Sequence, residues 1–322
     1  MKRNANAPER AQALKKNTGE SWLVRFGRDI SKRRGVYLIA IPVIVYYILF
    51  CYKPMYGLII AFKNYSAAGG VWGSKWVGLT HFKSFLTNPY FWRLMRNTLN
   101  ISLTNLIFGF PAPIILALML NEVRNKAFLR VSQTIVYIPH FISLTVICGM
   151  IVQFTNADGI INDLLAAFGA ERKSLLSYPQ YFVPIYVISG IWQGIGWSSI
   201  IYMAALTGID TSLYEAAMID GAGRWKQTLH VTLPGILPTV AIMLLTRIGQ
   251  LLSVGYEKII LLYNPLTYET ADIISTYVYR KGILEQSYSF STAVGLFNSV
   301  ISFILLIGAN TFSKKLGQGS LW

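Results

Sequence analysis

The stretch Ser212–Pro234, SLYEAAMIDGAGRWKQTLHVTLP, is a polar loop between two long apolar segments of the chain. Ser212 is followed three residues later by Glu215, a capping-box pattern that predicts the start of a helix. Gly221 is expected to take the left-handed backbone conformation that ends this helix and turns the chain. The first half of the loop is therefore predicted to be one short, capped helix.

The second half of the loop carries a different pattern. Trp225, Leu229 and Leu233 recur every four residues and predict a second short helix with a single apolar stripe. Pro234 is expected to mark the boundary between this helix and the apolar segment that follows. Two short helices joined by a glycine turn would form a compact knob.

The composition around this loop is that of a membrane protein. The 322 residues are 53% hydrophobic and 13% charged, with a mean hydropathy of +0.45. Soluble domains carry about 25% charged residues, so half that fraction favours a bilayer as the solvent. The net charge of +15 would suggest a nucleic-acid partner in a soluble protein, but most basic residues flank apolar segments here. They are expected to set membrane topology, and no nucleic-acid partner is predicted.

Six apolar runs are each long enough to cross a hydrocarbon core of about 30 Å as a helix. They cover residues 36–62, 98–120, 131–154, 181–206, 236–256 and 292–312. A helix satisfies its backbone hydrogen bonds internally, which lipid requires. The predicted fold is an all-α, polytopic membrane protein with six transmembrane helices and a loop at 211–235.

The basic residues predict the orientation of these spans. Residues 1–34 hold ten Lys and Arg side chains, which places the N-terminus in the cytoplasm as a basic arm that touches anionic lipid headgroups. Residues 35–322 then form the transmembrane domain, with the loop 211–235 and the C-terminus also cytoplasmic. The loop between the first two spans argues the other way, because it carries five basic residues and no acidic one. We place it outside because the N-terminal cluster is denser.

The loop also resembles a known family. The string EAAMIDGAGRWKQTLHVTLP is similar to the EAA loop of binding-protein-dependent ABC importer permeases, a family of bacterial inner-membrane proteins. Eight residues occupy the matching positions: Glu215, Ala216, Ala217, Asp220, Gly221, Ala222, Leu233 and Pro234. In that family the first helix of the loop is the coupling helix, which sits in a cleft of a separate ATPase. The resemblance implies that Glu215 contacts the ATPase and that the small residues keep the helix slim.

The same resemblance implies the remaining parts of an importer. These are a second homologous permease subunit, two ATPase subunits that bind ATP and Mg²⁺, and an extracytoplasmic solute-binding protein; no cofactor is expected on this chain. The strings at 81–102 and 255–283, with the terminal Ser320–Trp322, resemble the carbohydrate-importer branch and are closest to its polysaccharide and alginate-type permeases. A saccharide substrate is implied.

Several classes of protein are disfavoured by what the sequence lacks. It has no GxxxxGK[ST] motif, so ATP hydrolysis is assigned to a partner and the chain is not expected to be an enzyme. The two cysteines and three histidines lack metal-ligand spacing, so no metal site is predicted. Carboxylates are absent from the span centres, which argues against the main alternative, a secondary carrier or channel whose cytoplasmic loop is only structural.

Polar and aromatic side chains inside the spans are candidates for the substrate path, because burying them in lipid is costly. The candidates are Gln193, Arg247, Gln250 and Asn298, with Trp192 and Trp197 as possible stacking surfaces for sugar rings. Arg247, expected near the middle of the fifth span, has the alternative of pairing with a backbone carbonyl or a neighbouring subunit. The tryptophans have the alternative of facing lipid or packing between helices. Gly190 and Gly194 predict close helix packing of the fourth span.

Overall fold

The computed structural model describes residues 31–315, so the basic arm before residue 31 and the terminal Ser320–Trp322 lie outside the described residues. The chain divides into two compact units, Met1–Ile59 and Ile60–Trp322. The described part is helical apart from two two-residue strands, which confirms the predicted all-α class. The boundary predicted at residue 35 stays a prediction.

The described part of the first unit is one helical run with large exposed apolar side chains. It consists of α3 (Arg34–Tyr46), a π-helical turn (Tyr47–Tyr52) and α4 (Lys53–Met55), followed by the 3-10 turn Tyr56–Phe62. Its apolar side chains include Leu38, Ile39 and Phe50, which are 72%, 76% and 66% exposed in this chain. A long helix with no polar face in this stretch suits contact with lipid.

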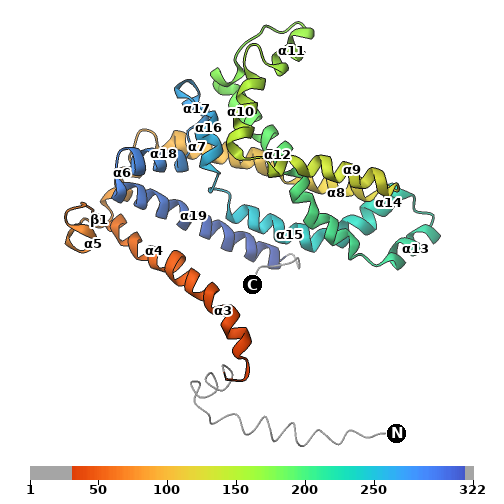
Figure 1. Ribbon diagram of the computed structural model, residues 1–322, viewed down its shortest axis with the longest axis horizontal. Helices are drawn as coiled ribbons and strands as arrows, with labels where there is room; N and C mark the ends of the chain where they lie inside the picture. Colours follow the sequence, from red (N-terminus) through yellow and green to blue (C-terminus); the bar gives the residue numbers. More distant parts are fainter. Residues whose placement is uncertain (1–30, 316–322) are drawn as a thin grey trace, which may run out of the picture. The chain divides into compact units, whose positions relative to one another are not determined.

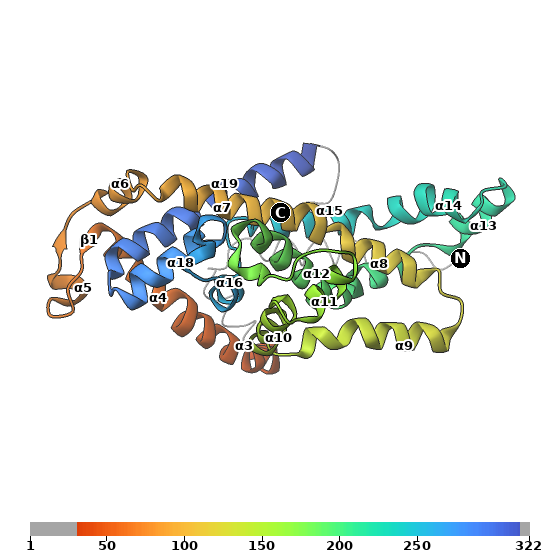
Figure 2. The same cartoon turned by 90° about the horizontal axis from the view of Figure 1, so that it is seen from above.

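The second unit begins with a small region of short strands and helices. Strands β1 (Lys63–Asn64) and β2 (Lys75–Trp76) pair antiparallel around α5 (Gly70–Gly73), and α6 (Thr80–Leu86) follows. A long helical segment comes next, formed by α7 (Phe91–Thr104), a π-helical turn (Asn105–Gly109) and α8 (Pro111–Asn121). Figures 1 and 2 place α5 and α6 at one end of this unit and α13 and α14 at the other.

The middle of the chain supplies α9 (Lys126–Tyr137), a 3-10 turn (Ile138–Phe141), α10 (Leu144–Thr155), α11 (Ile160–Ala167) and a 3-10 turn (Leu175–Ser177). The predicted single span 131–154 is wrong. Pro139 lies in the 3-10 turn, and the Ser143 hydroxyl accepts from the Val146 N–H to begin a new helix. The chain therefore breaks between α9 and α10, because proline removes a backbone donor and Ser143 caps a fresh start.

The second half of the unit contains the loop and three more long helical segments. Its elements are α12 (Pro179–Thr207), α13 (Thr211–Ile219), α14 (Arg224–Gln227), a π-helical turn (Thr228–Thr232), α15 (Leu233–Gly249), α16 (Tyr256–Leu262), a 3-10 turn (Pro265–Thr267), α17 (Tyr268–Ala271), α18 (Ile274–Tyr279), a π-helical turn (Arg280–Leu284) and α19 (Tyr288–Lys315). The predicted fifth span, 236–256, ends too late: α15 stops at Gly249, so Arg247 lies in its last turn rather than near its middle.

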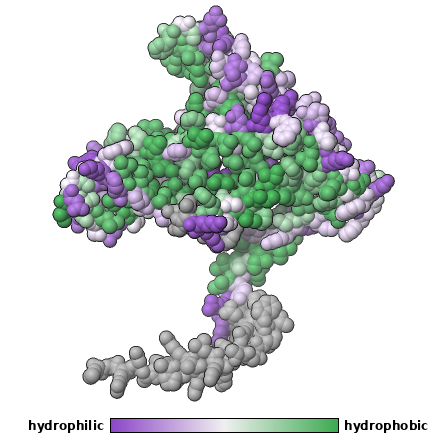
Figure 3. All heavy atoms as spheres, turned by 180° about the vertical axis from the view of Figure 1, so that it is seen from behind, coloured by the Kyte–Doolittle hydropathy of each residue, from purple (hydrophilic) through white to green (hydrophobic). Residues whose placement is uncertain are grey.

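Five helical segments among the described residues are long and apolar enough to cross a membrane. They are Arg34–Phe62, Phe91–Asn121, Leu144–Ala167, Arg224–Gly249 and Tyr288–Lys315. The remaining predicted span, 181–206, coincides with α12, whose 29 residues extend about 44 Å at 1.5 Å per residue. On the face of the second unit in Figure 3, apolar side chains form a broad band, and hydrophilic ones gather at its two ends and along its upper edge. Such a surface is suited to lipid.

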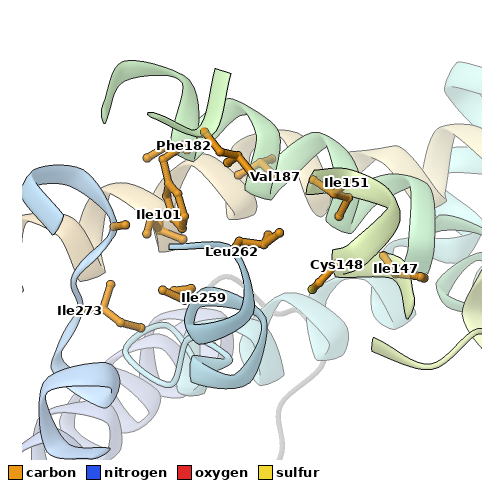
Figure 4. Close-up of a cluster of buried hydrophobic side chains, with 12 residues drawn as sticks. Ile101, Ile147, Cys148, Ile151, Phe182, Val187, Ile259, Leu262 and Ile273 are labelled. Atoms are coloured by element: carbon orange, nitrogen blue, oxygen red, sulfur yellow. The ribbon is translucent and has the colours of Figure 1, made fainter. Parts of the chain in front are cut away.

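The core of the second unit lies where α12 packs against its neighbours. Its largest buried cluster joins Ile101 of α7, Ile147 of α10, Phe182 of α12 and Ile259 of α16 (Figure 4). Lipid tails are as apolar as these side chains, so close packing rather than water exclusion holds the helices together. Of the three glycines of α12, the one with a close backbone approach is Gly196, against α9, and not Gly190 or Gly194 as the spacing of those two predicts.

Gly196→Ala is expected to destabilise the protein, whereas Gly194→Ala is expected to be nearly neutral. A Cβ at Gly196 would overlap the backbone carbonyl of Val136, but nothing lies within 4 Å of a Cβ at Gly194. Because backbone cannot rotate away, α9 and α12 must separate, and overpacking of this kind costs about 1–3 kcal/mol. The thermal unfolding midpoints of the two variants in detergent provide the check. Equal midpoints would contradict the assigned contact.

Candidate functional site

Helix α13 begins at a different residue from the one predicted. Its N-cap is Asp210, whose carboxylate accepts from the Ser212 backbone N–H at 2.9 Å, so the predicted Ser212–Glu215 capping box is wrong. This hydrogen bond holds the pKa of Asp210 below its usual value. Since the folded pKa is the lower one, the cap contributes stability above the ordinary carboxyl pKa and loses it as pH falls through the folded value. Glu215 is consequently free of any capping role.

The end of α13 follows the prediction. Gly221 has a φ of +72°, the left-handed conformation. The N–H of Ala222 donates to the Ala217 carbonyl at 2.9 Å, and the N–H of Gly221 donates to the Met218 carbonyl at 3.0 Å. These two bonds are those of a Schellman motif, which satisfies the last carbonyls of a helix and turns the chain sharply.

The second half of the loop is not a separate helix. α14, the π-helical turn Thr228–Thr232 and α15 form one continuous helical run, Arg224–Gly249. Pro234 therefore does not mark a break; it lies inside this run, two residues after the π-helical turn Thr228–Thr232, where the regular α-helical hydrogen-bonding pattern is already interrupted. The stripe predicted for a packed knob is also largely unburied, since Trp225 is 74% and Leu229 42% exposed.

The loop is nevertheless tied to this helical run. The Tyr214 hydroxyl lies 3.0 Å from the Thr232 Oγ1, and the Gln227 Nε2 donates to the Ala222 carbonyl at 2.8 Å. α13 also follows α12 after only three residues. α13 is therefore connected to α12 by a short link and to the run Arg224–Gly249 by two hydrogen bonds.

The candidate coupling residues lie on the outside of this loop. Glu215, Ala216, Asp220 and Gly221 are exposed, while Ala217, Ala222 and Leu233 are half-buried and Pro234 is exposed. The Glu215 side chain makes no hydrogen bond or ion pair with any other residue in the range 31–315. Beside it, Ile219 is 87% and Met218 58% exposed. The Glu215 carboxylate thus lies beside exposed apolar side chains on the surface of this chain. The role of these residues stays a prediction.

Three of the candidate path residues lie around adjoining cavities. Gln193 of α12 and Arg247 of α15 line a cavity of about 160 Å³, and Arg247 and Gln250 line a second cavity of about 220 Å³. Both cavities share Asn105, which begins the π-helical turn, and Gly109 leaves room for the Asn105 side chain. Asn105 lies near the middle of Phe91–Asn121 and Gln193 near the middle of α12, so the first cavity lies at mid-depth.

The other candidates are elsewhere. Asn298 donates to the Leu252 carbonyl at 3.2 Å and lines a cavity between α18 and α19. Trp192 lines an apolar cavity with residues of α10. Trp197 stacks on His140, with ring centroids 4.6 Å apart and an interplanar angle of 3°. The ring face of Trp197 toward His140 is therefore not available to a sugar ring. Asn298, Trp192 and Trp197 all stay candidates for the substrate path.

Sequence reasoning missed Lys258, a buried lysine that lines the same cavity as Gln193 and Arg247. It lies beyond the predicted end of span five, where polar residues were not considered for the path. The available signal was a single lysine within the apolar run YEKIILL. Within residues 31–315, no group of three His, Cys, Asp or Glu side chains is placed to hold a metal ion.

Comparisons with known proteins agree with this architecture. The family described as "Binding-protein-dependent transport system inner membrane component" matches residues 109–318. Protein LplB of Bacillus subtilis (strain 168) is 45% identical over 313 residues, which cover 97% of each chain. The polygalacturonan/rhamnogalacturonan transport system permease protein YteP of the same organism is 43% identical over 292 residues, covering 90% of this chain and 91% of that protein.

A solved structure has the same fold. It is the bacterial alginate ABC transporter in complex with an alginate pentasaccharide-bound periplasmic protein, in which one chain matches at 43% identity with a TM-score of 0.85, covering 92% of this chain and 100% of that chain. The matches in sequence and structure include the loop and both helices attached to it. This chain therefore belongs to the family of inner-membrane components of binding-protein-dependent transport systems.

Proposed function

We propose that this chain forms one half of an ATP-driven import path for an oligo- or polysaccharide, and that α13 couples the path to a separate ATPase. The chain is a transport subunit of the inner membrane, not an enzyme, and family membership sets aside the secondary-carrier alternative. A second homologous permease would complete the path, two ATPase subunits would bind ATP and Mg²⁺, and an extracytoplasmic binding protein would deliver the solute.

One observation carries the coupling proposal. The loop joins α12 to α15, and these two helices supply Gln193 and Arg247 to the cavity at mid-depth. From Pro234 to Arg247 the helix extends about 20 Å at 1.5 Å per residue. A displacement of α13 by an ATPase that closes on ATP would therefore move two walls of the cavity together. Alternating access needs such a rigid connection between the energy source and the solute path.

The proposed substrate class is supported by the relatives, and the proposed orientation by the distribution of basic residues. YteP is named for polygalacturonan and rhamnogalacturonan, and the solved relative carries alginate. Because relatives with 43% identity carry polysaccharides, a saccharide is the solute we propose here. We also propose that both termini are cytoplasmic, as the ten basic residues in 1–34 favour, with α5 and α6 at the extracytoplasmic end opposite α13 (Figure 1).

The proposed function is tested by assembly and stimulation. The tagged chain, expressed with its neighbouring transport genes and purified in detergent, should co-purify with a second permease and an ATPase. In proteoliposomes, the ATPase activity of this complex should rise when a saccharide-loaded binding protein is added, but not with the unloaded binding protein. A chain that purifies alone, or a complex whose ATPase ignores every saccharide-loaded binding protein, would refute the proposal.

A further inference from the structure

Lys258 is a buried cation in the second unit, beside the cavity that Gln193 and Arg247 line. It lies in α16, and only 7% of its surface is exposed. Its neighbours Ile259 and Leu262 belong to the largest buried hydrophobic cluster (Figure 4). α16 packs against α10, which holds the lysine inside the chain rather than on its lipid face. A lysine in such surroundings is rare and requires compensation.

The structure compensates this charge only in part. The ammonium Nζ donates to the Tyr186 carbonyl at 3.1 Å and lies 4.9 Å from the centre of the Tyr186 ring. It approaches α12 at Gly190, where a Cβ would lie 3.4 Å from Nζ. No carboxylate in the range 31–315 forms an ion pair with it. An ammonium has three donors, so two of them are left for a partner from outside the chain.

The space beside Lys258 is polar and lies on the proposed path. The cavity of about 160 Å³ is also lined by Arg247, Gln193 and Asn105, and no acidic residue lines it. Two cations and two amides around one cavity at mid-depth form a site complementary to an anion. A carboxylate bound there would form charge-assisted hydrogen bonds in a medium of low polarity, where they are strongest.

We propose that Lys258 and Arg247 together bind the carboxylate of an acidic sugar, such as a uronate residue, as the glycan chain passes the middle of the membrane. This inference rests on the proposed function and names its substrate class. Gln193 and Asn105 serve the ring hydroxyls of the same sugar unit. Lys258 is thereby a residue that determines specificity, because a neutral glycan leaves its charge uncompensated.

The proposal predicts opposite effects of one substitution on stability and on binding. Lys258→Met keeps the length of the side chain and removes the charge, so the ligand-free complex should unfold at a higher temperature than wild type. Trigalacturonate should raise the unfolding temperature of the wild-type complex in detergent, whereas neutral maltotriose should not. In Lys258→Met this rise should disappear, and the KM for uptake of the acidic trisaccharide should increase about tenfold or more.

Two further variants sharpen the test. Lys75→Met removes an exposed lysine of β2, far along the chain from the cavity, and should behave like wild type in every assay. Gly190→Ala places a methyl group against the ammonium and should weaken trigalacturonate binding while the charge is kept. The site is supported if both Gly190→Ala and Lys258→Met weaken trigalacturonate binding, while only Lys258→Met raises the unfolding temperature of the ligand-free complex.

Other results overturn the inference. If Lys258→Met lowers the unfolding temperature, the lysine is paired within the assembled complex, for example with the second permease, and does not await a substrate. If trigalacturonate stabilises wild type and Lys258→Met equally, or stabilises neither, Lys258 binds no carboxylate. A complex that still imports a saccharide in those cases leaves the proposed function intact, whereas a complex that imports none refutes the proposed function itself.

Discussion

Glu215→Ala is expected to abolish most of the stimulation of the partner ATPase by the loaded binding protein while leaving the fold of this chain unchanged. Glu215 is exposed, and its side chain makes no hydrogen bond or ion pair within residues 31–315. The N-cap of α13 is Asp210, so removing the Glu215 carboxylate costs the helix no capping bond. Truncating one member of a charged contact that is buried in an interface costs about 2–5 kcal/mol. We therefore expect stimulated activity to fall roughly 30-fold or more.

Glu122→Ala is the matched control for this measurement. Glu122 lies on the neighbouring loop at the same end of the unit and pairs with Arg224 at 3.5 Å, with both side chains about half exposed. Exposed pairs of this kind contribute at most about 1 kcal/mol, so the control should stay within a few-fold of wild type. If both variants retain full stimulated ATPase activity and full transport, Glu215 has no part in coupling.

The structure makes the Glu215 experiment cleaner than the sequence alone suggests. A Ser212–Glu215 capping box would mix folding with coupling in any Glu215 variant. The pattern was misleading because Asp210, two residues earlier, is an equally good N-cap and its carboxylate reaches the Ser212 N–H. A local pattern names the types of residue that can cap a helix, but the path of the chain leaving α12 decides which of them does.

The spans were predictable from composition, whereas their breaks were not. Apolar runs locate segments that lipid can accommodate, and the all-α class follows because helices satisfy their own backbone. Pro139 and Ser143 divide the predicted third span, and α15 ends at Gly249, where a Cβ would lie 2.9 Å from the Leu306 side chain of α19. Hydropathy does not register such breaks, because it measures how apolar a stretch is and not whether a proline or a new N-cap interrupts the helix.

The residues that line the cavity were likewise only partly predictable from the sequence. Gln193 and Arg247 were recognisable as costly polar residues in apolar segments, and the structure brings them to one cavity. Lys258 was not recognisable in this way. Its placement depends on the chain that returns from α15 to pack α16 against α10 and α12. The sequence identified side chains that need a partner, but only the fold decides which of them share a space.

Asp272→Asn is expected to be the most destabilising of the substitutions considered. Asp272 is fully buried, and its carboxylate accepts two hydrogen bonds from the Arg280 guanidinium, at 2.8 and 2.7 Å. Arg93 lies 3.5 Å away, and the Thr276 hydroxyl donates at 2.8 Å. These contacts fasten the segment between α17 and the turn Arg280–Leu284 to α7. Removing the carboxylate charge leaves two partly buried cations uncompensated, which costs about 3–5 kcal/mol.

Reversible unfolding in detergent, followed by circular dichroism, measures this loss, and two comparisons identify its origin. Glu285→Gln removes an exposed partner of Lys281 and should change the unfolding free energy by no more than about 1 kcal/mol. Adding Arg280→Met to Asp272→Asn should recover part of the loss, because one of the stranded cations is then removed as well. A double variant that is less stable than Asp272→Asn alone would mean that Arg280 stabilises the fold through its packing over Tyr268 rather than through the buried charge pair.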